Sequence, residues 1–173
     1  MHIEKRLALY GIELTDCPDI TKSYITSTTD KYHVYVSGIQ VHCPSNLFHE
    51  GHIIGKQLST KWLEACARRS LANQLSMLKR IVEDLDIVDH IIKMVYYING
   101  IGTKEDWRQV TKETTDIMRE VFGEAGDCEI CTIAPVPLPP GQPVQIDLLV
   151  SLPSSPRSNS LHVCEGVKGN GSF

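Results

Sequence analysis

A single apolar stripe constrains the fold of this chain more than any other feature of its sequence. Between Leu63 and Leu85, large apolar residues recur at steps of three and four, while Lys, Arg and Glu fill the opposite positions. This spacing predicts an amphipathic helix from Thr60 to about Asp84, with Ser59 as its N-cap. A helix with one apolar face needs a second layer that covers that face.

The other elements predicted from the sequence supply that layer. A second amphipathic helix is expected from Thr103 to Phe122, ended by Gly123, and a short helix is expected before Gly11. Runs rich in Val, Ile and Tyr predict strands at residues 23–27, 32–40, 90–98, 130–136 and 144–152. This order predicts an α+β domain of two layers, in which both long helices cover one face of a mixed sheet.

The stretch from Ile130 to Val150 holds two apolar runs on either side of a turn rich in proline and glycine. We expect the two runs to form a hairpin that builds one wall of a small-molecule pocket. Because successive side chains of a strand point to opposite faces, Ile130 and Thr132 are expected on one face, and Cys131 and Ile133 on the other.

The bulk composition limits the classes of function. With 173 residues, of which 42% are hydrophobic, we expect one globular domain at residues 1–152. Residues 153–173 are rich in Ser, Gly and Asn and are predicted to form a disordered tail. The net charge of −4 without a basic stripe argues against a nucleic-acid partner, and no apolar run is long enough to cross a membrane. A secretion signal is missing at the N-terminus, so a cytoplasmic protein with reduced cysteines is expected.

No metal and no cofactor are expected. Cys128 and Cys131 have CxxC spacing, but a zinc site needs a second pair of ligands, which the sequence does not offer at a suitable spacing. Two interpretations of Cys128 remain open. It is either a structural or incidental thiol, or a pocket thiol on the same side as Ile130 and Thr132.

Several motifs between Tyr24 and Leu152 resemble the RidA/YjgF family of enamine/imine deaminases, once called L-PSP endoribonucleases. The motifs are YVSG at 35–38, the alanines and leucines of residues 65–75, YIN at 97–99, VFGEAG at 121–126, LP at 138–139 and VQID at 144–147. The resemblance implies a chorismate-mutase-like α+β fold, a homotrimer, and pockets for a small-molecule substrate between subunits. No nucleic acid and no membrane are expected as partners.

The same resemblance suggests the residues of the site. Tyr24 and Ser37 stand at the tyrosine and serine positions of the family. The arginine that binds the substrate carboxylate falls at Ile130, the glutamate that positions water falls at Gln145, and a frequent asparagine falls near Lys112. The predicted catalytic residues are Tyr24, Ser37 and Gln145, and the predicted substrate-binding residues are Ile130, Thr132, Lys112 and Cys128.

The two missing charges decide what function is expected. Ile130 offers no hydrogen-bond donor to a carboxylate, and Gln145 can orient a water molecule but cannot accept its proton. Hydrolysis of 2-aminoacrylate-type imines is therefore expected to be weak or absent. One hypothesis is a divergent enzyme that hydrolyses, tautomerises or cyclises an imine, enamine or related intermediate in specialised metabolism. The other is a non-catalytic trimer that binds a metabolite or a protein.

Overall fold

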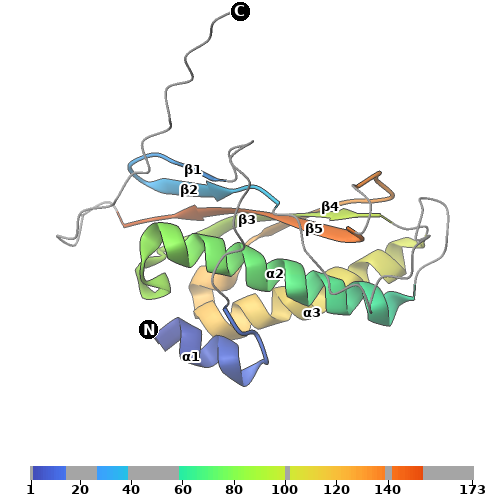
Figure 1. The fold of residues 1–173 in the computed structure, drawn as a ribbon, viewed down its shortest axis with the longest axis horizontal. Helices are drawn as coiled ribbons and strands as arrows, with labels where there is room; N and C mark the ends of the chain where they lie inside the picture. The colour runs from blue at the N-terminus through green and yellow to red at the C-terminus, as the bar shows by residue number, and fades with distance from the viewer. Residues whose placement is uncertain (1, 15–26, 39–58, 100–101, 139–141, 154–173) are drawn as a thin grey trace, which may run out of the picture.

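A computed structural model describes residues 2–14, 27–38, 59–99, 102–138 and 142–153, called here the described ranges. Within them, a five-stranded sheet in the order β1-β2-β5-β3-β4 lies against two long helices (Figure 1). The elements are α1 (His2–Leu9), β1 (Ser27–Thr29), β2 (His33–Val36), α2 (Thr60–Val82), η1 (Leu85–Ile87), β3 (His90–Ile98), α3 (Lys104–Phe122), η2 (Gly123–Gly126), β4 (Glu129–Ile133) and β5 (Val144–Ser151). The predicted α+β class is confirmed.

Both long helices begin where the sequence predicts. The Ser59 hydroxyl accepts a hydrogen bond from the backbone N–H of Trp62 and caps α2. Thr103 and Asp106 form a reciprocal capping box at the start of α3. That helix ends at Gly123, whose φ of +65° is available to glycine at little steric cost. None of the helices in the described ranges is long and apolar enough to span a membrane.

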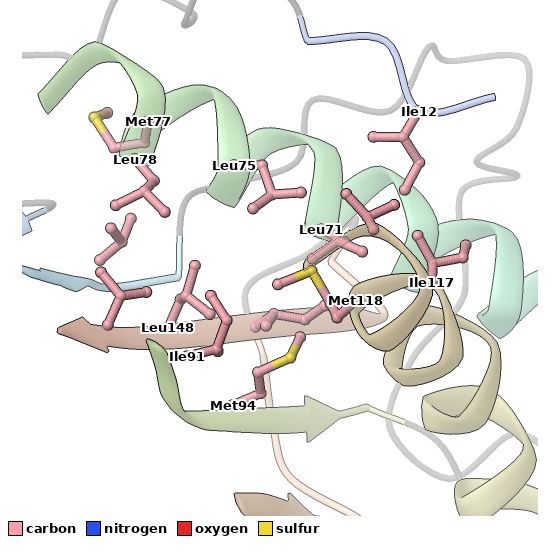
Figure 2. Close-up of a cluster of buried hydrophobic side chains, with 14 of the residues drawn as sticks. Ile12, Leu71, Leu75, Met77, Leu78, Ile91, Met94, Ile117, Met118 and Leu148 are labelled. Carbon is pink, nitrogen blue, oxygen red and sulfur yellow. The ribbon is translucent and has the colours of Figure 1, made fainter. Parts of the chain in front are cut away.

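The two helices and the sheet enclose one hydrophobic core. The apolar stripe of α2 is buried as predicted, and it faces Ile91 and Met94 of β3 and Leu148 of β5 (Figure 2). Helix α3 contributes Ile117 and Met118 to the same cluster (Figure 2). Helix α1 packs on α3 from outside (Figure 1).

The predicted hairpin between residues 130 and 150 is wrong. Strand β3 lies between β4 and β5; it pairs in parallel with β4 and antiparallel with β5. Helix α3 carries the chain back along the sheet, so β4 starts at the same end as β3 and lies parallel to it. The connection from β4 to β5 then passes the end of β3, where Val136 N–H donates to the Ile98 carbonyl and Asn99 N–H donates to the Pro143 carbonyl. The sequence of β4 and β5, which are separated by ten residues, does not reveal whether the two strands pair with each other in the sheet.

The second face of the sheet carries no helix in the described ranges (Figure 1). We call this the open face. Strand alternation and register assign it the side chains of His33, Tyr35, His90, Lys93, Val95, Tyr97, Glu129, Cys131, Ile133, Gln145, Asp147, Leu149 and Ser151. The predicted placement of both long helices on one face is confirmed. The predicted tail lies outside the described ranges apart from Pro153, so the division at residue 152 stays a prediction.

Candidate functional site

A nearly buried carboxylate lies at the centre of the open face. Asp147 is in the middle of β5, beside Val95 of β3, and is only 6% exposed. Its neighbours Ile146 and Leu148 are fully buried in the core, so strand alternation directs Asp147 to the opposite face. A carboxylate this far from water needs hydrogen-bond donors around it.

Four donors surround this carboxylate. The hydroxyl of Tyr35 donates to Oδ2 at 2.7 Å, and the backbone N–H of Gly38 donates to Oδ1 at 2.6 Å. Two longer hydrogen bonds come from the Tyr97 hydroxyl to Oδ2, at 3.3 Å, and from Gln145 Nε2 to Oδ1, at 3.5 Å. We call Tyr35, Gly38, Tyr97, Gln145 and Asp147 the Asp147 cluster. Two tight contacts fix the acid, and two loose ones leave room for exchange with a ligand or water.

Gly38 determines where the side chain of Gln145 lies. A Cβ at position 38 would overlap Cγ, Cδ and Nε2 of Gln145, so only glycine leaves this space free. The end of β2 is fixed from the other side of the sheet by the buried Gln74 of α2, whose Nε2 donates to the Ser37 carbonyl at 3.3 Å. The Gly38 amide is thereby aimed at Asp147.

We expect Gly38→Ala to act through Gln145. Overpacking of this kind typically costs about 1–3 kcal/mol of unfolding free energy, and the added methyl would push Gln145 away from Asp147. In a Gln145→Ala background the same substitution should cost close to nothing, because the overlapping atoms are gone. Urea denaturation of the two single variants and the double variant measures this coupling. Equal costs in both backgrounds would contradict the assignment.

The two tyrosines of the cluster are hydrogen-bond donors rather than bases. Burial, followed by the hydrogen bond to Asp147 and its negative charge, raises the pKa of Tyr35 to about 12. The Ser37 hydroxyl acts weakly in the opposite direction. Burial and the charge of Asp147 also raise the pKa of Tyr97. Both hydroxyls therefore keep their protons at neutral pH.

Substitution Asp147→Asn should lower the pKa of Tyr35 while leaving the contribution of burial in place. In the wild-type protein the native pKa of about 12 exceeds the ordinary value of 10.0, so the folded state binds more protons between these values. The free energy of unfolding should therefore fall as pH rises from about 10 to 12, and less so in the variant. Tyrosinate absorbance during alkaline titration, with Tyr35→Phe to identify the transition, measures the shift. A Tyr35 transition that Asp147→Asn leaves unchanged would refute this coupling.

The structure brings some of the predicted site residues together. Gln145 belongs to the Asp147 cluster, and the half-buried Ser37 lies between Tyr35 and Gly38 at the end of β2. Tyr24 lies outside the described ranges. Lys112 is on the helix side of the sheet, exposed on α3 and paired with Asp116, so one chain does not bring it to the cluster.

The predicted substrate-binding residues of β4 lie on the other face of the sheet. Ile130 is in register with Met94, and Thr132 with Tyr96, and both partners are fully buried in the core. Parallel partners share a face, so Ile130 and Thr132 point toward the helices and Gln145 points away from them. Within one chain, the predicted pocket with Ile130 opposite Gln145 is therefore not formed.

Cys128 also packs against the core rather than on the open face. Burial raises the pKa of its thiol to about 11, although Arg119 acts in the opposite direction. The thiol is therefore protonated at neutral pH and is a poor nucleophile. The β4 residues that reach the open face are Glu129, Cys131 and Ile133.

The sequence interpretation missed Asp147, Tyr35 and Tyr97 as site residues. The signal for Asp147 was present, because it stands two residues after Gln145 and strand alternation places both on one face. The family's carboxylate is missing at position 145, as expected, but the same face of the sheet keeps a carboxylate at Asp147. Tyr97 lies on the open face because its neighbour Tyr96 is fully buried in the core.

Metal ligands do not converge on the Asp147 cluster, which contributes one carboxylate and no imidazole. Elsewhere in the described ranges, Glu4, Asp84 and Asp86 are close enough together to hold an ion. Asp86 already accepts hydrogen bonds from the backbone amides of His2 and Ile3 at the start of α1. Asp86 therefore has a structural role in docking α1.

Comparison with known proteins supports the fold. No protein-family model matches the chain. Protein TCP17 of Trypanosoma cruzi is 24% identical over 151 residues, which cover 87% of this chain and 94% of that protein.

Solved structures extend the comparison. Atu1372 of Agrobacterium tumefaciens, a protein with unknown function, has a TM-score of 0.73 at 22% identity and covers 88% of this chain and 94% of its own. A candidate endoribonuclease from Shewanella oneidensis has a TM-score of 0.69 at 21% identity. The match covers 88% of this chain and 100% of that one. YyfA of Yersinia pestis, of the conserved Rid protein family and unknown function, has a TM-score of 0.53 at 20% identity, with 82% and 97% covered. These likenesses establish a shared fold.

Proposed function

We propose that this chain, whose fold is the RidA/YjgF fold predicted from its motifs, is a divergent RidA-like enzyme that hydrolyses imines or enamines at the Asp147 cluster. The observation that carries the proposal is Asp147 itself, a carboxylate 6% exposed on the open face and hydrogen-bonded to two tyrosine hydroxyls. A carboxylate can accept the proton that Gln145 cannot, and a positioned base typically contributes about 10²–10⁴ in rate.

The geometry supports a division of roles within the cluster. Tyr35 and the Gly38 amide, at 2.7 and 2.6 Å, hold Asp147 in place. The attacking water replaces Gln145 Nε2, which lies 3.5 Å from Oδ1, as a donor to that oxygen. Asp147 then deprotonates this water. The Tyr97 hydroxyl, which lies 3.3 Å from Oδ2, turns toward the substrate and donates a hydrogen bond to the oxygen atom that water adds to it.

The balanced reaction is the hydrolysis of an iminium ion. Water adds to the carbon of the C=N bond, and the proton that Asp147 accepts from it is passed to the nitrogen. The C–N bond then breaks as the carbonyl group forms, and the remaining hydroxyl proton passes through Asp147 to the departing ammonia. An iminium ion and water thus give a carbonyl compound and ammonium. No redox partner is needed.

We also propose that the chain forms a homotrimer whose contacts cover the open face. The small-molecule substrate would bind near the boundary between subunits, and the protein would act in the cytoplasm. Tyr35 and Ile133 are 37% and 41% exposed on a single chain, and no helix of the described ranges covers the face that carries them (Figure 1). Light scattering should give three times the chain mass of 19.3 kDa. A monomer at micromolar concentration would refute the trimer.

The activity is tested with imines generated in place by an amino-acid oxidase or an amine oxidase. We expect ammonia release faster than the spontaneous rate, with weak or no activity on 2-aminoacrylate. Asp116→Asn removes one exposed carboxylate from α3 and should leave the rate unchanged. Spontaneous rates with every imine class would overturn the proposed enzyme.

The four donors around Asp147 also favour a second function. A carboxylate whose oxygens are all occupied resembles a structural group, and a trimer with such a site would bind a metabolite without turning it over. Mass spectrometry of a complex incubated with its ligand separates the two functions. An unchanged ligand indicates a binding module, and a converted one indicates an enzyme.

A further inference from the structure

The charges on the open face restrict the substrates that the site can accept, an inference that rests on the proposed function. Three side chains on this face in the described ranges are cationic or can become so: His33, His90 and Lys93. Both histidines align with Ser151, four residues along β5 from Asp147. At about 3.4 Å per residue, this separation keeps them out of contact with the acid.

Lys93 lies nearer to Asp147 but has its own partner. It aligns with Leu149, two residues from Asp147, and its Nζ lies 3.4 Å from Oε1 of Glu129. The charges of Lys93 and Glu129 offset each other. Within the described ranges, Asp147 is thus left with hydrogen-bond donors but without a cation beside it.

The surroundings of Asp147 are otherwise apolar. Val95 is its direct partner on β3, and Leu149 follows it on the same face of β5. Ile133 lies beside Tyr97 and is 41% exposed. Among the described residues, this negative charge has apolar side chains around it and no cation beside it, so it complements a cationic group on an apolar body.

We infer that the Asp147 cluster takes substrates whose reacting nitrogen is a cation on an apolar body and that carry no carboxylate. Iminium ions formed by oxidation of hydrophobic amines belong to this class. The protonated nitrogen lies toward Asp147, while the Tyr35 hydroxyl keeps its hydrogen bond to Oδ2 of that residue. A substrate carboxylate in the same place would meet the charge of Asp147, and the described ranges of the chain place no cation beside it as an offset.

A matched pair of ligands tests this inference. Phenethylamine and phenylalanine differ by one carboxylate and are not hydrolysed, so their binding to the full-length protein reports selectivity without turnover. The imine that an amine oxidase forms from phenethylamine and the 2-imino acid that an amino-acid oxidase forms from phenylalanine are the matching substrates. Calorimetry measures binding, and ammonia release above the spontaneous rate measures hydrolysis.

We expect phenethylamine to bind at least about tenfold more tightly than phenylalanine, and Asp147→Asn to abolish this preference. Tyr97→Phe, which keeps the charge of Asp147, should preserve it. Asp116→Asn removes an equal charge on the helix side and should also preserve it. Equal or tighter binding of phenylalanine, or a preference that survives Asp147→Asn, would overturn the inference.

The hydrolysis data separate this inference from the proposed function. Selective binding of phenethylamine without hydrolysis of either imine supports the substrate class and overturns the enzyme. Faster hydrolysis of the 2-imino acid than of the amine-derived imine supports the enzyme and overturns the substrate class.

Discussion

Replacement of Asp147 by alanine should both unfold the protein more easily and abolish turnover. The substitution leaves the Gly38 N–H and the Tyr35 hydroxyl without their shared acceptor. Hydrogen bonds to charged groups contribute about 1.5–3 kcal/mol each, so we expect a loss of about 3–4 kcal/mol of unfolding free energy. Urea denaturation at neutral pH measures it.

Asp147→Asn separates the structural role of the acid from its chemical role. The asparagine side-chain oxygen can still accept from Gly38, so the expected loss of unfolding free energy is only about 1–2 kcal/mol. An amide cannot take a proton from water, so turnover should still fall about 10²–10³-fold. An asparagine variant with wild-type turnover would show that Asp147 has a structural role only, and would favour a different catalytic base.

Gly126→Ala is expected to be among the most destabilising single-methyl changes in the chain. A Cβ there would overlap the carbonyl oxygen of Met118 and lie 2.7 Å from its carbonyl carbon. Both atoms belong to the backbone of α3, which cannot move aside as a flexible side chain can. We expect a loss of about 3 kcal/mol, and a melting temperature lower by roughly 10 °C.

Gly123→Ala in the same turn provides the matched control. Gly123 has a φ of +65°, but a Cβ there would have no atom within 4 Å. The variant should therefore lose only about 1–2 kcal/mol, the cost of an alanine held at a φ of 65° and a ψ of −136°. Equal losses at the two positions would show that backbone conformation, rather than overlap with α3, makes Gly126 necessary.

The helices could be predicted almost residue by residue because their signals are local. Ser59, Thr103 and Gly123 mark the ends of α2 and α3, and the apolar stripes mark the buried faces. Strand β3 was likewise predicted over its full length of His90–Ile98. Each of these predictions depends on residues within a few positions of one another.

The order of the strands could not be predicted in the same way. The spacing of β4 and β5 along the chain suggested a hairpin, whereas long-range pairing places β3 between them. The candidate site depends on that pairing, because Tyr35, Tyr97 and Asp147 come from three different strands. The motif resemblance identified β5 as part of the site, but it pointed to Gln145 rather than to Asp147. A motif gives the positions of residues in the sequence and does not give their hydrogen-bond partners.

The position of β5 has a consequence for biosynthesis. It is the last strand of the described ranges to leave the ribosome, yet it occupies the middle of the sheet, between β2 and β3. Until β5 emerges, the nascent chain has two separate sheet fragments, β1–β2 and β3–β4, and it lacks Asp147. A product truncated before Val144 would therefore expose both inner strand edges at once, and such edges are prone to aggregate.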